Sequence, residues 1–145
     1  MADTAKTPVK VAMTTNMQQE DERETIQLNA DGEMYEKQEW TYVRFEEELE
    51  GIGKVQTTLK IGDAEVMVLR SGAVAMRQVY AYGERTEGTY DMGYGRLHTE
   101  AVTDHLAVTR ANPGWMMHID FHYRLALQGT PVGRYEISIV IEEDV

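Results

Sequence analysis

Apolar and polar residues alternate along most of this chain, and that two-residue period constrains the fold more than any other feature of the sequence. Alternation of this kind is typical of β-strands that bury one face and expose the other. No segment has a long helical period, so the sequence predicts an all-β domain. The alternating rows contain Val9, Val11, Met13, Ile26, Leu28, Val55, Thr57, Leu59, Ile61, Trp115, Met117, Ile119, Phe121, Tyr123, Leu125, Leu127, Tyr135, Ile137, Ile139 and Ile141.

Turn-forming residues separate these rows at short intervals, which predicts about ten strands joined by hairpins. A sheet of sequential hairpins would leave two open edges, and closure into a barrel removes both. We therefore expect one closed antiparallel β-barrel of about 8–10 strands over residues 8–145, after a disordered tail at residues 1–7. The predicted turns lie at Asp31-Gly32, Gly51–Gly53, Gly62-Asp63, Ser71-Gly72, Gly93–Gly95, Asn112–Gly114 and Gly129–Gly133.

The chain is strongly acidic, with 25 acidic residues, 14 basic ones and a net charge of −11. Such a surface repels phosphate backbones and anionic lipid, so we expect neither nucleic acid nor membrane as a partner. The N-terminus has no signal-peptide run and no stretch suits a membrane span, which favours a cytoplasmic protein. The absence of cysteine agrees with that compartment. We interpret the acidic cluster Glu46, Glu47, Glu48 and Glu50 as a solvated strand end.

The hairpin around Gly62-Asp63 allows a residue-level prediction. A two-residue turn there pairs Lys60 with Glu65, and this opposite-charge pair supports the register. The same register places Arg70 on the inner, apolar face. A buried guanidinium is costly unless a carboxylate, carbonyl groups, water or an anionic ligand answers it. The predicted inner-face pairs are Ile61–Ala64, Leu59–Val66, Thr57–Val68 and Val55–Arg70.

One arginine and four tyrosines are candidates for the lining of an interior cavity: Arg70, Tyr80, Tyr90, Tyr94 and Tyr123. Aromatic walls with one oriented charge are typical of small-molecule sites. The alternative is a filled core in which the tyrosine hydroxyls reach the rim and the arginine is a structural plug. Both alternatives place the same residues inside the barrel.

Apolar residues also fall on the predicted outer face. Trp40 and Tyr42 share one face of a strand that is apolar on both faces, and Met67 and Leu69 point outward in the predicted hairpin. Strands that are apolar on both faces are usually covered on both. The outer apolar face is covered either by the N-terminal strand at residues 8–17 or by a second subunit. The second alternative predicts a homodimer.

Three of the four histidines are predicted to share one outer patch. His118, Asp120 and His122 alternate on one strand, and a four-residue turn at residues 111–114 places His105 opposite Asp120. These are metal-ligating residue types. His118 and His122, however, are about 13 Å apart along a strand and do not suit one ion. We interpret the patch as a solvated polar face and expect no metal and no cofactor.

The sequence offers little for nucleophilic catalysis. Cysteine is absent, and the two serines, Ser71 and Ser138, lie outside any Gly-x-Ser-x-Gly elbow. The glycines Gly93 and Gly95 precede a predicted strand rather than the helix that a phosphate-binding loop needs, so we interpret them as a tight turn. This favours a non-enzymatic protein.

The segments VMVLRSGAVAMRQVYAYG and GTYDMGYGRLHTEAVTDHL resemble the YwiB-like family of small bacterial proteins. The likeness is carried by Arg70-Ser71-Gly72, Met76, Tyr80, Tyr90 and Tyr94-Gly95. It implies a calycin-like, or lipocalin-like, antiparallel barrel without an established activity. The Gly-x-Trp signature of lipocalins proper is absent, so no lipocalin ligand is carried over.

Two hypotheses of function follow. The leading one is a non-enzymatic barrel that binds a small apolar or anionic ligand in its interior. The alternative is a protein-interaction or structural module that forms a homodimer through its apolar outer face. An enzyme is the third, and the sequence names no ligand for any of them.

Overall fold

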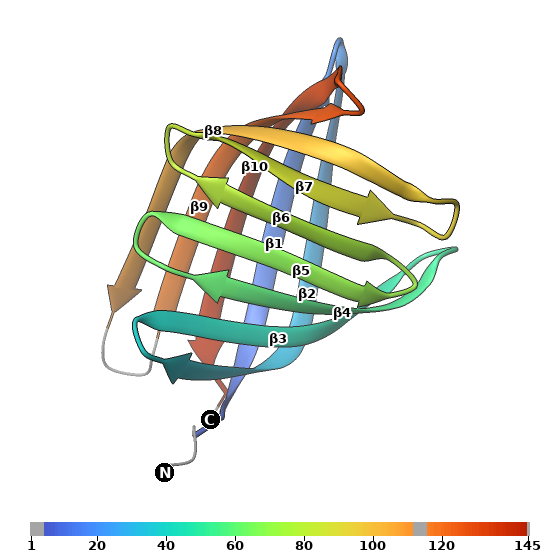
Figure 1. Cartoon of the computed structure of the whole chain (residues 1–145). Helices are drawn as coiled ribbons and strands as arrows, with labels where there is room; N and C mark the ends of the chain where they lie inside the picture. Colours follow the sequence, from blue (N-terminus) through green and yellow to red (C-terminus); the bar gives the residue numbers. More distant parts are fainter. Residues whose placement is uncertain (1–4, 112–115, 145) are drawn as a thin grey trace.

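The computed structural model describes residues 5–111 and 116–144, and its ten strands form one closed antiparallel barrel (Figure 1). Each strand pairs with its neighbours in sequence, and β1 closes the barrel against β10. The predicted fold is confirmed. The strands are β1 (Thr7–Gln19), β2 (Glu22–Lys37), β3 (Trp40–Leu49), β4 (Gly53–Ile61), β5 (Glu65–Gly72), β6 (Ala75–Ala81), β7 (Arg85–Asp91), β8 (Arg96–Ala111), β9 (Met116–Leu127) and β10 (Thr130–Glu143).

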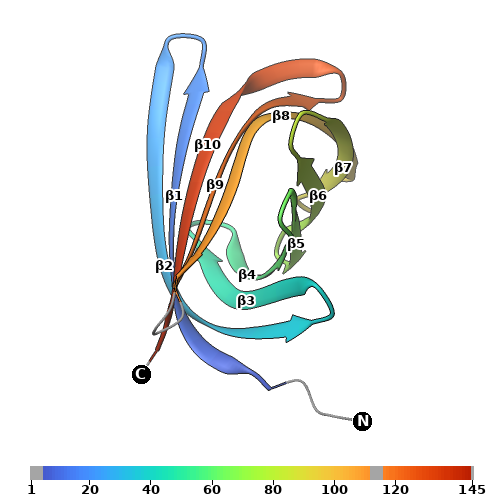
Figure 2. The same ribbon diagram turned by 90° about the vertical axis from the view of Figure 1, so that its left-hand side faces the viewer.

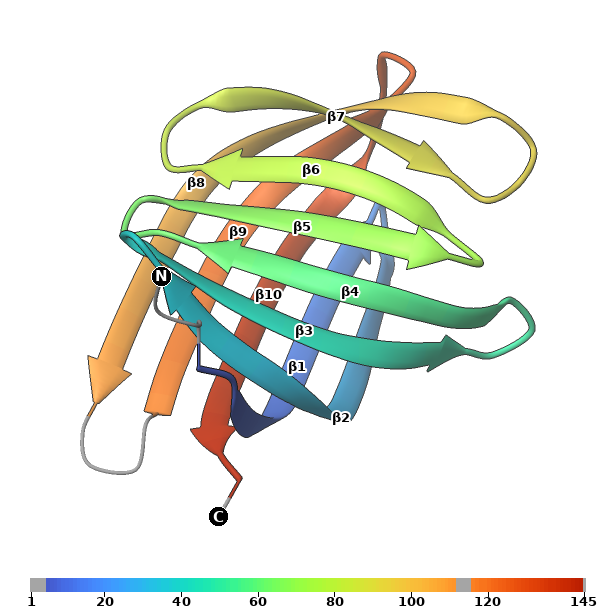
Figure 3. The same cartoon turned by 60° about the horizontal axis from the view of Figure 1, so that its bottom comes forward.

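The barrel is flattened into two faces that cross each other. Strands β3 to β7 run across the front in Figure 3, and β8, β9, β10 and β1 run steeply behind them. Figure 2 shows the two faces from the side, with the β1–β2 and β9–β10 turns at one end and the described chain ends at the other. None of the described residues forms a helix that could cross a bilayer.

The N-terminal strand is part of the barrel wall. β1 begins at Thr7 and lies between β10 and β2. The expectation that the N-terminal strand covers the outer face of β3 is therefore wrong. Thr7 was assigned to the tail and belongs to β1, while residues 1–4 lie outside the described part of the chain. Every described strand belongs to this single barrel.

The β4–β5 hairpin differs from its predicted register by two residues. Ile61 pairs with Val66 rather than Ala64, so four residues instead of two lie between the last paired residues of the hairpin. Lys60 therefore lies opposite Met67 and not opposite Glu65. A shift of two residues keeps every side chain on its predicted face, since side chains alternate with a period of two. The remaining inner-face pairs are Leu59–Val68, Thr57–Arg70 and Val55–Gly72.

The turn predicted at Asp31-Gly32 is wrong, because β2 continues through it. Gly32 lies opposite Phe45 in β3. A Cβ atom added at Gly32 would come within 2.5 Å of the Arg44 carbonyl oxygen. This glycine allows two strands to approach closely instead of turning the chain.

A β-bulge shifts the register between β8 and β9. Thr103 pairs with Tyr123 and His105 pairs with His122, so Asp104 is the extra residue. The prediction that His105 lies opposite Asp120 is wrong, because the pairing on the turn side of the bulge, from Ala111–Met116 to His105–His122, is shifted by two residues from the predicted register. Both side chains still share the outer face. The Asn112–Gly114 turn, and Trp115 beside it, lie outside the described residues.

The core fills the half of the barrel nearer the chain ends. Its buried apolar side chains come from strands all around the wall, and most polar residues of these strands alternate outward as predicted, with buried exceptions such as Thr41. Burial of this apolar surface is the main favourable contribution to folding. Core members at this end include Val9, Val11, Val43, Ile61, Val66, Met117, Ile119 and Ile141.

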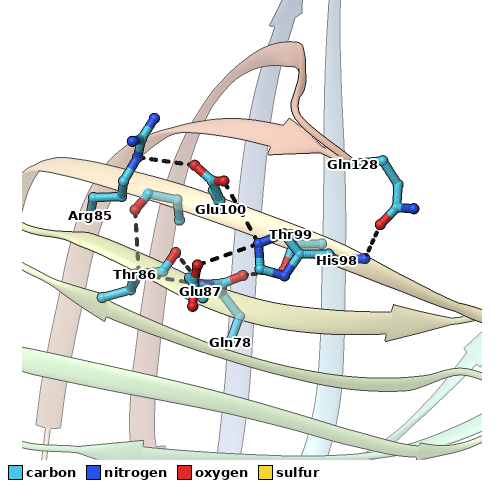
Figure 4. Close-up of polar contacts among 9 residues, drawn as sticks. Gln78, Arg85, Thr86, Glu87, His98, Thr99, Glu100 and Gln128 are labelled. Carbon is cyan, nitrogen blue, oxygen red and sulfur yellow. Dashed lines mark hydrogen bonds and ion pairs between the residues drawn. The ribbon is translucent and has the colours of Figure 1, made fainter.

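The seam between β6 and β7 is completed by side chains. Only three residue pairs connect these strands, from Ala75–Asp91 to Arg77–Thr89. Beyond them the buried Gln78 amide donates to the Thr86 carbonyl oxygen at 3.4 Å and accepts from the Thr99 hydroxyl at 2.6 Å. Figure 4 shows Gln78 between the two threonines. The glutamine thus replaces part of the missing backbone ladder.

Candidate ligand site inside the barrel

A cavity of about 520 Å³ occupies the half of the barrel away from the chain ends. It is lined by inward residues of β1 to β6, β9 and β10, and most of the lining is aliphatic or aromatic. Three acidic residues of β3 and its following turn also border it, together with a single basic side chain, Arg70. The barrel is therefore a cup with one filled end and one hollow end.

The charged group inside the cup is an arginine–glutamate pair. Arg70 Nε lies 3.5 Å from Glu47 Oε2, and the Thr57 hydroxyl donates a hydrogen bond to the same carboxylate oxygen. The Glu47 side chain is only 4% exposed, so its assignment to a solvated strand end is wrong. Of the groups predicted to compensate Arg70, a carboxylate, carbonyl groups, water or an anionic ligand, the structure shows the carboxylate of Glu47.

The arginine is only partly satisfied by this pair. The Nε atom is buried and makes no hydrogen bond to a described residue, and no other Arg70 nitrogen donates to one. The side chain is 23% exposed and lines the cavity, so it is not enclosed by the packed core. A guanidinium carries five N–H donors in a fixed fork. Arg70 therefore keeps donors for another group.

Aromatic rings form the wall beside Arg70. The Tyr80 ring centroid lies 4.9 Å from that of Phe121 and 4.4 Å from that of Tyr123, which stacks on Tyr135 at 5.2 Å. Burial raises the pKa of Tyr80 to about 12, against the opposing effects of Tyr123 and the Arg70 charge. Burial also raises the pKa of Tyr123 well above its usual value. The wall is thus neutral at physiological pH.

The structure brings together three of the five predicted cavity residues. Arg70, Tyr80 and Tyr123 line the cavity. Tyr90 lies opposite Met76 and does not reach the lining, and Tyr94 is 97% exposed in the turn between β7 and β8. The inclusion of Tyr94 was wrong because its two flanking glycines place it in a turn beyond the strand end.

Two functional candidates were missed from the sequence, Glu47 and Tyr135. Both carried a usable signal. Glu47 continues the inward alternation of Val43 and Phe45, and Tyr135 begins the row that ends at Ile141. The period of two places each of them inside, whatever its polarity.

The predicted interface residues lie on the outer face, where they are half-buried. Lys60 Nζ lies 4.4 Å from the Trp40 ring centroid and 6.0 Å from that of Tyr42. Met67 lies across the ladder from Lys60, and Leu69 lies opposite Arg77. A cation over two aromatic rings covers part of this face within the chain itself.

The predicted histidine patch divides into two parts. His105, Asp120 and His122 offer ligand atoms that lie within 4.8 Å of one another. His118 is separate, with its Nε2 atom 2.9 Å from the Ser138 hydroxyl oxygen. The bulge at Asp104 is what brings the first two histidines face to face.

Comparison with known proteins gives consistent results. Residues 11–139 match the family described as a domain of unknown function, DUF1934. The uncharacterized beta-barrel protein YwiB of Bacillus subtilis (strain 168) is 34% identical over 98 residues, which covers 68% of each protein. The crystal structure of the ywiB protein from Bacillus subtilis has a TM-score of 0.85 and 27% identity, and the match covers 97% of this chain and 94% of that one. The resemblance predicted from the sequence is confirmed.

Proposed function

Since the chain belongs to the DUF1934 family, whose description assigns no activity, we propose from its cavity that the protein is a non-enzymatic binding barrel for one small ligand. The ligand has an apolar or aromatic body and is either uncharged or carries one anionic group. Its body packs against the Tyr80–Tyr123 wall, and its polar end approaches Arg70. Ligand cavities of about 300–1,000 Å³ with few polar groups are typical of small-molecule sites.

The observation that carries this proposal is the unused hydrogen-bonding capacity of Arg70 at the cavity wall. If Arg70 only filled space in the core, its N–H groups would be expected to donate to carbonyl groups or to a bidentate carboxylate. Arg70 instead meets Glu47 through Nε alone, at 3.5 Å. A carboxylate or sulfonate would accept from the terminal nitrogens without displacing Glu47.

The other charges limit the ligand to one negative charge. Glu47 neutralises Arg70 formally, and Glu48 and Glu50 border the same cavity. A ligand with several negative charges would therefore meet net repulsion. The apolar lining supplies most of the binding free energy, and Arg70 orients the ligand.

The test uses anilinonaphthalene sulfonate, an aromatic probe with a single sulfonate whose fluorescence rises in apolar sites. We expect saturable binding of one equivalent to the folded protein. The Arg70→Gln/Glu47→Gln double variant keeps the net charge of the pair at zero and should weaken binding by about tenfold. Arg77→Gln, on the exposed face of β6, is the matched control and should leave the affinity unchanged.

Absence of saturable binding, or equal affinity in the double variant and the wild type, would refute the role of Arg70. Circular dichroism of each variant establishes that the barrel is folded. Native mass spectrometry of the purified protein gives an independent result, because a bound cellular ligand would appear as added mass on the 16.5 kDa chain.

The second candidate is self-association through the outer face. One continuous row crosses five neighbouring strands on that face: Tyr35, Tyr42, Lys60, Met67 and Val79. Methionine and aromatic side chains suit protein contacts. Sedimentation equilibrium at micromolar concentration tests it, and a 16.5 kDa species at every concentration would exclude a homodimer of useful affinity.

A further inference from the structure

The bulge in β8 has a specific effect on the outer surface. Before it, Thr103 is buried on the inner face, and after it Leu106 pairs with the buried Phe121. The alternation has therefore slipped by one residue, and Asp104 and His105 both lie outside. Bulges re-aim side chains and are frequent beside functional sites. Here the bulge moves an imidazole to the position opposite His122.

The three side chains converge on one small region. His105 Nε2 lies 3.3 Å from Asp120 Oδ2, and His122 Nε2 lies 3.5 Å from Asp120 Oδ1. The two imidazole rings are 4.6 Å apart between centroids. Zinc bonds of about 2.0–2.1 Å in a tetrahedron separate neighbouring ligand atoms by roughly 3.4 Å. The two nitrogen–oxygen distances fit that value, and all the ligand atoms lie within 4.8 Å of one another.

Hydrogen bonding does not account for the convergence. Neither imidazole makes an aligned hydrogen bond to Asp120 among the described residues, although both approach it closely. His118 on the same strand shows the contrast, since it has an aligned contact with Ser138. The ligand atoms of the cluster lie within 4.8 Å of one another, and the two histidine–aspartate contacts are close ion-pair approaches rather than aligned hydrogen bonds.

From these observations we propose that His105, Asp120 and His122 form a surface site for a divalent transition metal ion of the zinc class. Two imidazoles and a carboxylate are ligands that zinc prefers. The side chains are 45%, 34% and 25% exposed in that order, so water can complete the coordination. The ion links β8 to β9 beside the bulge. This site is separate from the interior cavity and stands independently of the proposed ligand function.

A carboxylate lies behind one of the two imidazoles. His122 Nδ1, on the far side of the ring from Asp120, lies 3.9 Å from Glu136 Oε2 in β10. Metal-binding histidines usually direct their second nitrogen to a carboxylate or carbonyl group, which fixes the ring orientation. Glu136 is therefore placed as a positioning residue for His122.

The other histidine–carboxylate cluster lacks this arrangement. Glu87, His98 and Glu100 also bring three ligand atoms together, as Figure 4 shows. Glu100, however, is engaged by Arg85, whose Nε lies 3.0 Å from it. That cluster also has only one imidazole, and the guanidinium already pairs with one of its two carboxylates. It serves as the internal control.

Isothermal titration with zinc chloride, on protein without a histidine tag, tests the proposal. We expect one equivalent to bind with micromolar affinity and to raise the melting temperature. His105→Ala and His122→Ala should each weaken binding by more than about tenfold, and Glu136→Gln should weaken it by about tenfold. His118→Ala and His98→Ala are matched controls and should bind as the wild type does.

Lack of saturable zinc binding to the wild type would overturn the proposal, as would full binding by both cluster variants. Loss of binding in His98→Ala instead would transfer the site to the other cluster and equally overturn it. Asp120→Asn, which keeps the side-chain shape, replaces any alanine variant that fails to fold.

Discussion

Arg70 and Glu47 pair inside the barrel with unequal access to water: the glutamate side chain is 4% exposed and the arginine side chain is 23% exposed. Because the carboxylate reaches less water, stabilisation of its charge depends on its protein partners more than that of the guanidinium does. We expect Arg70→Leu to lower the free energy of unfolding by about 2–3 kcal/mol, because it leaves a buried carboxylate uncompensated. Urea denaturation monitored by tryptophan fluorescence measures the change.

Addition of Glu47→Gln to Arg70→Leu should recover most of the lost stability. The glutamine amide carries no charge and still accepts a hydrogen bond from Thr57. A double variant as unstable as Arg70→Leu alone would mean that packing of the arginine stem, not charge, is what matters at this position.

Gly88 in β7 has no room for a methyl group. A Cβ atom there would lie 2.4 Å from both the Arg77 carbonyl oxygen and Gln78 Oε1, and 2.7 Å from Thr99 Oγ1. We expect Gly88→Ala to cost about 2–3 kcal/mol of stability, because backbone and a packed amide must move. Thr89→Ala, one residue along on the outer face, should cost less than about 1 kcal/mol and is the control.

Gln78 should be sensitive to replacement by an apolar residue of similar size. Gln78→Leu removes the bond to Thr86 and leaves the Thr99 hydroxyl without its acceptor in a buried setting. We expect a loss of about 2–3 kcal/mol in urea denaturation. A variant as stable as the wild type would show that water satisfies the two threonines.

Alkaline pH should destabilise the barrel through its buried tyrosines. The pKa of Tyr80 rises from 10.0 to about 12 on folding, so the unfolded chain loses this proton first. The contribution of Tyr80 to the free energy of unfolding is complete below pH 10 and is lost as the pH rises through about 12. Its full size is about 3 kcal/mol. Absorbance at 295 nm during a pH titration should show a late ionisation step, smaller in Tyr80→Phe.

If the late step coincides with unfolding by circular dichroism, ionisation and unfolding are linked as expected. A Tyr80→Phe variant with the same alkaline unfolding curve as the wild type would contradict the contribution of this tyrosine. Tyr123 and Tyr135, whose pKa values are also raised by burial, should contribute to the step that remains.

The faces of the strands could be predicted, while the lengths of their turns could not. The predicted β4–β5 register was wrong by two residues, yet Arg70 was correctly placed inside, because an even shift preserves the alternation. A single-residue error would have reversed every side chain. Turn length depends on local backbone geometry that the alternation does not encode. The alternation therefore predicts which face each residue occupies, but not the exact register.

Individual irregularities account for the errors in the candidate site. His105 lies opposite His122 rather than Asp120 because the β8–β9 pairing beside the turn is shifted by two residues. The bulge at Asp104 changes the parity of β8 farther from the turn, and no residue type in that stretch signals it. Tyr94 follows an aromatic pattern but lies beyond the end of β7. Glu47 was assigned by its charge, although alternation with Val43 and Phe45 placed it inside. Polarity was a weaker guide than position along the strand.

The three-pair seam between β6 and β7 has a consequence for motion. A closed barrel has no free edge from which to unravel, so its first opening must separate two paired strands. The β1–β2 ladder has thirteen residue pairs, and the β6–β7 ladder has three. Native-state amide exchange should therefore be fastest along β7, where the wall can part at the smallest loss of backbone hydrogen bonds. Separation of β6 from β7 would let the barrel wall open along this seam as a hinge.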